Sequence, residues 1–314
     1  MIFRVKQICF FFLCGMYATT SLFSAYARLD DGTLGIIKLP NEGCPIILAP
    51  GQTFKVIAEQ KGELFLIDSE NQILSLTAQW KSPTPNLWEA TVTVVGEGIK
   101  EGPYSLQIIT ETHTKDMNPR SVWVQSSFKE FYTFAHISDI HIRNNDPDDE
   151  QTTTFQSTIE KLNQSDAQFV LITGDLTHDA TMEQWGMFLK ILNQCKKPTF
   201  VCAGNHDRDG NTYEKIFNTS TYAFRYGKDG YIVYDTREYQ IADSWGEQDT
   251  LLYRYRKELK SSRWVLGITH RYDFTMGIRA QIILFVDDPI DFILYGHTHR
   301  ENTKEESMLP WGKT

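Results

Sequence analysis

Five short polar groups in the second half of the chain each follow an apolar run, and this recurrence constrains the fold more than any other feature. Runs such as 170–173 and 292–295 have the length and composition of buried strands. An α/β sheet places its ligands at the carboxyl ends of its strands, so the pattern predicts one site assembled from several strand ends. The groups are Asp139-x-His141, Gly174-Asp175, Gly204-Asn205-His206-Asp207, His270 and Gly296-His297-Thr298-His299.

Strand and helix patterns alternate from Phe131 onward, which is typical of an α/β core with both sheet faces covered. Residues 222–225 and 231–235 resemble the two arms of a hairpin. The sequence therefore predicts an α/β domain over residues 127–314. Its expected strands are 131–137, 169–173, 199–203, 264–269 and 292–295, and its expected helices are 153–164, 182–193 and 248–259.

The preceding region, residues 28–126, contains short β-rich runs separated by turn residues such as Pro50-Gly51. This pattern predicts a small all-β sandwich. No cluster of His, Cys or carboxylates has ligand spacing here, so we expect a structural or accessory module, with substrate or partner binding as the alternative. The expected strands are 34–39, 53–58, 73–78, 90–95, 104–110 and 122–125.

The first 27 residues have the pattern of a secretory signal peptide. Arg4 and Lys6 form a basic start, an apolar run begins at Ile8, and Ala25-Tyr26-Ala27 fits a signal-peptidase site. We therefore expect an exported protein (periplasmic, cell-surface or extracellular). A retained membrane anchor formed by the same segment is the alternative, because residues 8–27 approach spanning length.

Three cysteines follow this leader: Cys44, Cys195 and Cys202. An odd number without close pairing does not make a disulfide framework, so buried thiols are expected. The chain also carries 31 Lys and Arg against 40 Asp and Glu, a net charge of −9. Such a surface repels a phosphate backbone, so no long nucleic acid is expected as a partner, whereas a metal-bridged phosphate substrate stays open.

The polar groups combine imidazoles, carboxylates and an amide, and they require no thiolate. Oxygen and imidazole ligands suit Mn, Fe, Zn or Co better than a structural zinc site, which would favour Cys. Seven candidate ligands are too many for one ion. Two ions that share a carboxylate would leave positions for water and a phosphate oxygen, as in two-metal hydrolysis with ions about 3.5–4 Å apart.

In this order, the five groups resemble the blocks of the calcineurin-like metallophosphoesterase superfamily, across residues 131–300. The resemblance implies an αββα sandwich, phosphoester hydrolysis, and two divalent or mixed-valence metal ions, with Mn, Fe or Zn expected. It also implies a role for each residue. One ion would be bound by Asp139, His141 and His299, and the other by Asn205, His270 and His297, with Asp175 bridging them.

The same resemblance places His206 beside the substrate phosphate, where it would stabilise charge or protonate the leaving oxygen. Asp207 would orient the His206 ring. A proton donor at this point agrees with general acid catalysis of phosphoester cleavage.

Two positions separate the chain from purple acid phosphatases. Its first block is Asp-x-His instead of Asp-x-Gly, and His178 stands where those enzymes carry a metal-binding Tyr, so a Tyr-ligated iron centre is not expected. The run Gly174-Asp175-Leu176-Thr177 is similar to the cyclic-nucleotide phosphodiesterase branch. For His178 and for Arg271 a contact with substrate is open, and a surface position is the preferred interpretation.

We therefore expect an exported phosphoesterase that acts on a small-molecule phosphodiester or phosphomonoester, such as a nucleotide. The alternative is an exported binding protein that uses the β-sandwich and keeps the phosphoesterase fold as an inactive scaffold. A membrane contact is expected only through an uncleaved leader, and no pattern sets the oligomeric state. Residues 301–314 are a short polar tail where relatives continue with further strands, so an incomplete C-terminus is an open reading.

Overall fold

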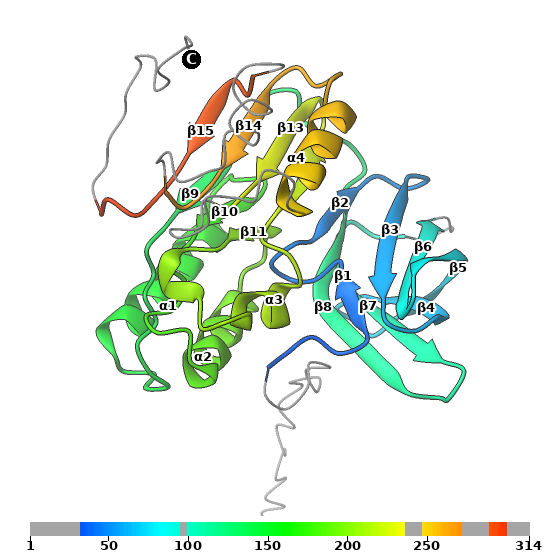
Figure 1. The fold of residues 1–314 in the computed structure, drawn as a ribbon, viewed down its shortest axis with the longest axis horizontal. Helices are drawn as coiled ribbons and strands as arrows, with labels where there is room; N and C mark the ends of the chain where they lie inside the picture. The colour runs from blue at the N-terminus through cyan, green and yellow to red at the C-terminus, as the bar shows by residue number, and fades with distance from the viewer. Residues whose placement is uncertain (1–31, 95–98, 236–246, 272–288, 300–314) are drawn as a thin grey trace, which may run out of the picture.

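A β-rich region and an α/β region lie side by side in the computed structural model (Figure 1), which describes residues 32–94, 99–235, 247–271 and 289–299. The predicted leader at 1–27 and the tail at 301–314 lie outside the described residues. None of the helices in the described ranges is long and apolar enough to cross a membrane.

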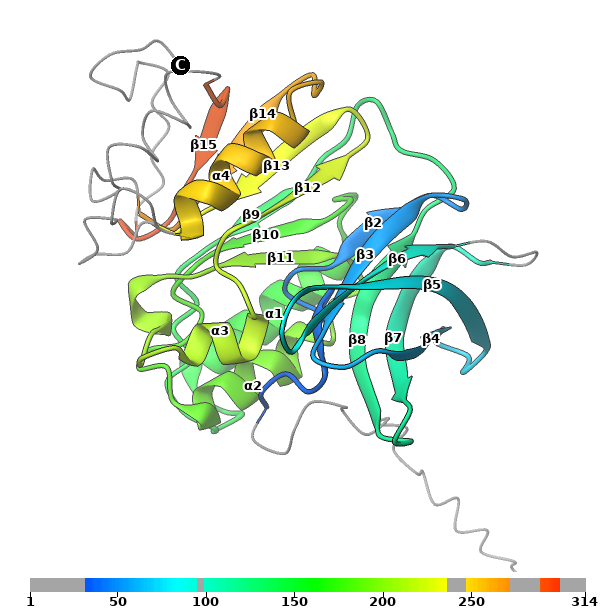
Figure 2. The ribbon, with the colours of Figure 1, turned by 45° about the vertical axis from the view of Figure 1, so that its right-hand side comes forward.

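The N-terminal region is one eight-stranded sheet in the order β1-β3-β6-β5-β4-β7-β8-β2. The long strand β5 pairs with β4 through its first residues and with β6 through its later ones, so the sheet turns there (Figure 2). Inward-facing residues from both halves share one core, which makes the region sandwich-like. The strands are β1 (Ile37–Leu39), β2 (Ile46–Leu48), β3 (Thr53–Ala58), β4 (Gly62–Ile67), β5 (Ile73–Thr84), β6 (Leu87–Thr93), β7 (Gly102–Thr110) and β8 (Lys115–Val124).

The C-terminal region contains two sheets. The first is parallel, in the order β11-β10-β9, and the second has the order β12-β13-β14-β15, in which β12 and β13 form the predicted hairpin. The strands are β9 (Ala135–Ile137), β10 (Val170–Thr173), β11 (Thr199–Cys202), β12 (Tyr222–Tyr226), β13 (Asp229–Val233), β14 (Val265–Ile268) and β15 (Phe292–Leu294). The helices are α1 (Glu150–Gln164), α2 (Met182–Leu192), α3 (Thr212–Phe217) and α4 (Glu247–Glu258), with one 3-10 turn at Asn205–Asp207.

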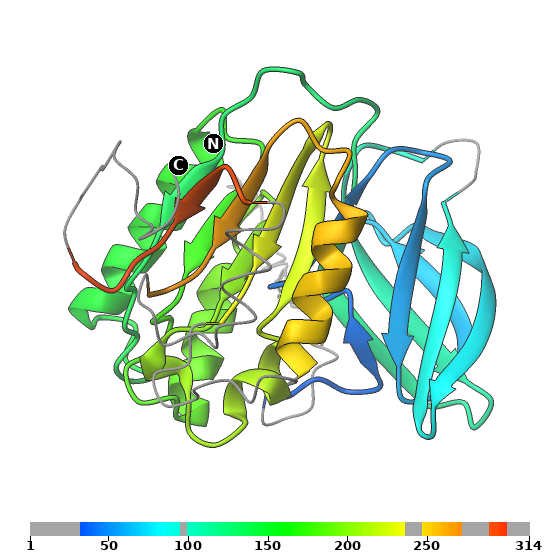
Figure 3. The same ribbon diagram turned by 45° about the horizontal axis from the view of Figure 1, so that its top comes forward.

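Alternate side chains of the central strands enter different cores, and this alternation produces four layers. In β10, Val170 and Ile172 pack against α1 and α2, whereas Leu171 faces the second sheet. Phe200 of β11 and Phe224 of β12 stack between the two sheets with ring centroids 3.5 Å apart. Because α4 covers the other face of the second sheet (Figure 3), the predicted αββα sandwich is confirmed.

Helix α1 shows how local sequence sets an element in this sandwich. The Asp149 side chain accepts hydrogen bonds from the backbone N–H groups of Gln151 and Thr152, so the helix begins earlier than the predicted residue 153. Phe155, Ile159 and Leu162 then recur at helical spacing on the buried face. The helix thereby covers the outer face of the first sheet.

The β-rich region contacts the α/β region along β11, the edge strand of the first sheet. Val201 N donates to Gly43 O (2.9 Å), and Thr199 Oγ1 donates to Glu42 O (2.7 Å). Arg120 of β8 reaches the end of α2, where its guanidinium donates to Leu192 O (3.0 Å). The segment around Gly43 thus closes the edge of β11, while the domain boundary near residue 127 stays a prediction.

Cys44, Cys195 and Cys202 are buried, free thiols, as expected from their number and spacing. Burial raises the pKa of each of these thiols, which keeps them protonated and unreactive at neutral pH.

Candidate metal centre

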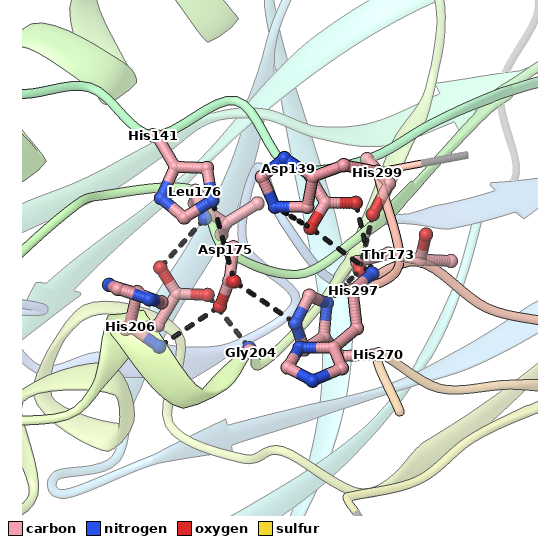
Figure 4. A network of polar contacts seen from close by, with 12 residues as sticks. Asp139, His141, Thr173, Asp175, Leu176, Gly204, His206, His270, His297 and His299 are labelled. Carbon is pink, nitrogen blue, oxygen red and sulfur yellow. Dashed lines mark hydrogen bonds and ion pairs between the residues drawn. The ribbon is translucent and has the colours of Figure 1, made fainter. Parts of the chain in front are cut away.

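The loops that follow β9 and β10 run alongside each other and bring the first two polar groups together. Asp139 N donates to Gly174 O (3.1 Å), and His141 N donates to Asp175 O (2.9 Å). The third, fourth and fifth groups follow β11, β14 and β15, and all five meet at one place (Figure 4). The predicted convergence of strand ends is therefore present in the structure.

Three groups of possible metal ligands form at this place, and two of them include a carboxylate. Ligand atoms of Asp139, His141 and His299 lie within 4.8 Å of one another, and we call these residues the outer position. Ligand atoms of Asp175, His270 and His297 also lie within 4.8 Å of one another, and we call these residues the inner position. The outer position has the members that the resemblance implies for one ion. The inner position contains His270 and His297, implied for the other ion, together with Asp175, the implied bridge, whereas Asn205 is not a member of this group.

Asp175 lies between the two positions, as Figure 4 shows. Its Oδ2 atom is 3.1 Å from His270 Nε2 and 3.5 Å from His141 Nε2. One carboxylate therefore faces both positions, which is the geometry that a bridging ligand needs.

Several donor atoms at the centre lack hydrogen bonds within the described part of the chain. Asn205 Oδ1 and His141 Nε2 are buried and have no hydrogen-bond partner there. Buried polar atoms in native proteins are nearly always satisfied, so such atoms call for a further ligand. Each can offer an electron pair to a cation, and the donor set therefore fits metal ions.

The second ring nitrogen of His270 is fixed by the backbone. His270 Nδ1 lies 2.7 Å from Thr173 O, and this carbonyl can only accept a hydrogen bond, so Nδ1 carries the hydrogen. Nε2 is then the atom available to an ion, an arrangement usual for histidine ligands. On the other side, His297 N donates to both carboxylate oxygens of Asp139 (3.1 and 3.0 Å) and orients that side chain.

Four of the candidate metal ligands have shifted pKa values. Burial lowers the pKa of His141, and burial together with neighbouring His270 lowers that of His297. Burial alone would lower the pKa of His270 and raise that of Asp175. Their mutual attraction outweighs it, so the His270 pKa is raised and the Asp175 pKa is lowered. We therefore expect an ion at the inner position to compete with a proton for His270.

The backbone is strained at most of the candidate ligands. Left-handed φ angles are uncommon for residues other than glycine and cluster at functional sites in proteins. The strain lets each side chain turn inward directly after its strand. The residues concerned are Asp139 (57°), His141 (51°), Asp175 (51°), His297 (74°) and His299 (49°).

Two glycines allow the polar groups to approach each other. A Cβ atom on Gly204 would lie 2.1 Å from Asp175 Oδ1, and one on Gly296 would lie 1.8 Å from Ser138 Oγ. Only glycine fits at either point without displacing these neighbours. The missing side chain at these two positions therefore allows the backbone to approach Asp175 and Ser138 closely.

His206 and Asp207 both lie at the centre, but they do not make the contact expected of them. The Asp207 carboxylate accepts hydrogen bonds from the backbone N–H groups of Leu176, Thr177 and Gly204. His206 Nδ1 instead lies 2.7 Å from the backbone oxygen of His178. The expectation that Asp207 orients the His206 ring is wrong, because the Asp207 carboxylate is bonded to backbone amides. These hydrogen bonds join the second and third polar groups.

The preferred surface interpretation of His178 and Arg271 is also wrong. His178 is half-buried, with its Nδ1 atom 3.4 Å from His141 Nδ1 and its ring stacked on that of His206. Arg271 is half-buried too, and its charge contributes to the lowered pKa of His297. The sequence signal for His178 was its place three residues after Asp175, but the pattern did not show which way its ring turns.

Comparisons with known proteins identify the family of the α/β region. Residues 132–301 match the profile of the calcineurin-like phosphoesterases. A protein of Ruthia magnifica subsp. Calyptogena magnifica, described as a probable cyclic nucleotide phosphodiesterase, is 24% identical over 186 residues, which cover 54% of this chain and 79% of that protein.

A purple acid phosphatase from yellow lupin (Lupinus luteus) seeds is similar among solved structures, with a TM-score of 0.47 and 14% sequence identity. The alignment covers 79% of this chain, which spans 56% of the length of that structure. The profile match spans more than half of the chain and contains all five polar groups. The chain therefore belongs to the calcineurin-like phosphoesterase family.

Proposed function

We propose that the protein is a metal-dependent phosphoesterase that hydrolyses phosphodiester or phosphomonoester bonds of small molecules by water attack at a two-ion centre. The observation that carries this proposal is the position of Asp175 between the inner and outer positions. Family membership supports the hydrolase class.

The chemistry that two ions supply at such a site is activation of water and neutralisation of charge on the phosphoryl oxygens. We assign to His206 the transfer of a proton to the leaving oxygen. The backbone oxygen of His178 holds His206 Nδ1, so the ring can present Nε2 to a substrate. His206 N also donates to Asp175 Oδ1 (2.9 Å), which ties this proton donor to the carboxylate shared by the two positions.

A nucleotide or a similar small phosphoester is the proposed substrate. The net charge of −9 disfavours a long nucleic acid. The relative from Ruthia magnifica, described as a probable cyclic nucleotide phosphodiesterase, favours a diester over a monoester.

Mn, Fe or Zn are the proposed ions, because the site offers imidazole and oxygen ligands without thiolate. We also propose that the protein is exported, on the pattern of residues 1–27. The N-terminal sequence of the protein recovered from the cell envelope or medium tests this: an N-terminus after Ala27 supports export by cleavage, and an intact leader contradicts it.

The test of the function compares hydrolysis of a chromogenic phosphodiester and the matching monoester by the full chain loaded with Mn or Zn. The His206→Ala variant is measured beside it. We expect diester turnover that a chelator abolishes and that His206→Ala lowers by about 10²–10⁴-fold with its metal content unchanged. A folded chain that holds two ions yet turns over neither compound would contradict the proposal and favour the binding protein.

A further inference from the structure

His178 contacts the first and the third of the five polar groups through three different atoms. Its backbone N–H donates to Ile142 O (2.9 Å), next to the first group, and its backbone oxygen lies 2.7 Å from His206 Nδ1 in the third. Its ring nitrogen Nδ1 lies 3.4 Å from His141 Nδ1. The residue itself belongs to the loop of Asp175 at the inner position, so it links this loop to the segment of His141 at the outer position.

The ring of His141 has its two nitrogen atoms directed at different partners. Nε2 faces Asp175 Oδ2 at 3.5 Å, whereas Nδ1 faces His178. An Nε2 atom that binds an ion must offer a lone pair, so His141 Nδ1 then carries the hydrogen. His178 Nδ1 is the acceptor within reach of that hydrogen.

We propose that His178 is a positioning residue that holds the His141 ring with Nε2 toward the outer position and thereby sets the metal affinity there. This inference rests on the proposed function, because it concerns one of the two proposed ions. Outer partners of histidine ligands fix the tautomer and the ring orientation, and their loss typically lowers metal affinity about 10–100-fold.

A different role is a further cation ligand, since His141, His178 and His206 also offer nitrogen atoms within 4.8 Å of one another. The geometry favours the positioning role. The nitrogen that His141 turns to His178 is Nδ1, the one away from Asp175, and His206 Nδ1 is engaged with a carbonyl. A ligand role would require His141 to hold ions through both nitrogens.

Two substitutions separate the possible contributions of the side chain, and neither removes the backbone oxygen that contacts His206. His178→Phe keeps a flat ring that can stack on His206 but has no acceptor for His141. His178→Asn loses the ring and places a polar atom near the position of Nδ1. His113→Asn is the matched control, because His113 is exposed in a turn between β7 and β8, far along the chain from the centre.

Metal binding to the full chain, freed of metal beforehand, is measured by competition of Zn or Mn with a chromogenic chelator. We expect two ions per wild-type chain and per control. His178→Phe should weaken one of the two by about 10–100-fold and leave the other unchanged, and His178→Asn should recover most of the loss. Thermal unfolding of the metal-free variants checks that each is folded.

An unchanged affinity in a folded His178→Phe variant would overturn the inference while leaving the proposed function intact. A third ion in the wild type that His178→Phe loses would also overturn it and make His178 a ligand. A wild-type chain that binds no ion would refute the proposed two-ion centre, and the role of His178 with it. Nitrogen NMR of the histidine rings in the zinc-loaded chain gives a readout besides affinity: we expect a hydrogen-bonded Nδ1–H on His141 that loses this hydrogen bond in His178→Phe.

Discussion

The inner and outer positions use the same kinds of ligand but differ sharply in burial. The side chains of Asp175 and His270 are each 2% exposed, whereas that of His299 is 61% exposed. We expect an ion at the inner position to exchange slowly, because two of its three candidate ligands are almost fully buried. An ion at the outer position stays close to solvent, so we expect it to exchange faster and to be the one that contacts an arriving substrate.

The two positions also differ in the pKa shifts of their histidines. At the outer position, burial holds the pKa of His141 low, so its ring is already neutral near pH 7. At the inner position, Asp175 holds the pKa of His270 above its usual value. We therefore expect ion binding at the inner position to depend more strongly on pH than ion binding at the outer position.

Asp175→Asn should have the largest effect, because it removes the one charge that both positions share. We expect loss of both ions and a fall in turnover by orders of magnitude, since a neutral amide is a poor bridge between cations. Metal content by elemental analysis and turnover are measured on the same sample. Retained turnover would break the comparison, because the positions would then not depend on a common ligand.

The next largest effect is the difference in stability between the His270→Ala and His299→Ala variants, which change the inner and the outer position respectively. Removing His270 leaves the buried Asp175 without its partner, so we expect the metal-free protein to lose about 3–5 kcal/mol of stability. His299→Ala changes an exposed side chain and should stay within about 0.5 kcal/mol. Urea unfolding of the metal-free variants measures both. An equal loss of stability in both variants would show that the difference in burial does not affect the free energy of unfolding.

Metal removal from the loaded wild type should follow in two phases. A chelator in excess is expected to take the outer ion first, because His299 leaves that position open to solvent, and the inner ion later. Stopped-flow absorbance of the chelator records both rates. His299→Ala should show the slow phase alone, whereas a single phase in the wild type would contradict the difference between the positions.

The pH dependence should be the smallest of these effects. In the metal-free protein, the raised His270 pKa contributes stability that is complete below the unfolded value, about 6.5, and is lost as pH rises through the folded pKa. The lowered Asp175 pKa contributes stability that is present above about 3.9 and is lost as pH falls.

Metal binding therefore gains as pH rises, by up to about tenfold in affinity per pH unit for the one proton that His270 releases. The outer position should change less, because His141 is already neutral. Calorimetric titrations between pH 6 and 8.5 in two buffers of different ionisation enthalpy give the affinities and the released protons. A steeper slope at the outer position would reverse the assignment.

The α/β region was predicted closely because its signals are local. Strands β10 and β11 are buried along their whole length, and helix α2 was expected at 182–193 and is found at Met182–Leu192. Strands β2 and β4 of the first region were not predicted. Strand β2 has three residues and exists through parallel pairing with β8, a partner from the far end of that region, which no local pattern contains.

The same distinction applies to the centre. The polar groups and their convergence could be predicted, because strand ends of one sandwich meet at one edge. The contacts that hold these groups in place could not be predicted, because they depend on the backbone of the loops. The backbone oxygen of His178 contacts the His206 ring, and the Asp207 carboxylate accepts hydrogen bonds from amides of the neighbouring loop. The left-handed φ angles at Asp139 and Asp175 likewise arise from packing between loops, which residue types alone do not specify.

The hydrogen bond from Val201 N to Gly43 O joins two segments that are synthesised at different times. The Gly43 carbonyl is made before most of the β-rich sheet, whereas β11 is made only after α1 and α2. When β11 emerges, the segment that closes its outer edge is already present, so that edge is not left to pair with another chain, a common route to aggregation. A fragment that starts after residue 127 would make the same strand with an open edge. We therefore expect the preceding half to protect the α/β half from aggregation through this edge.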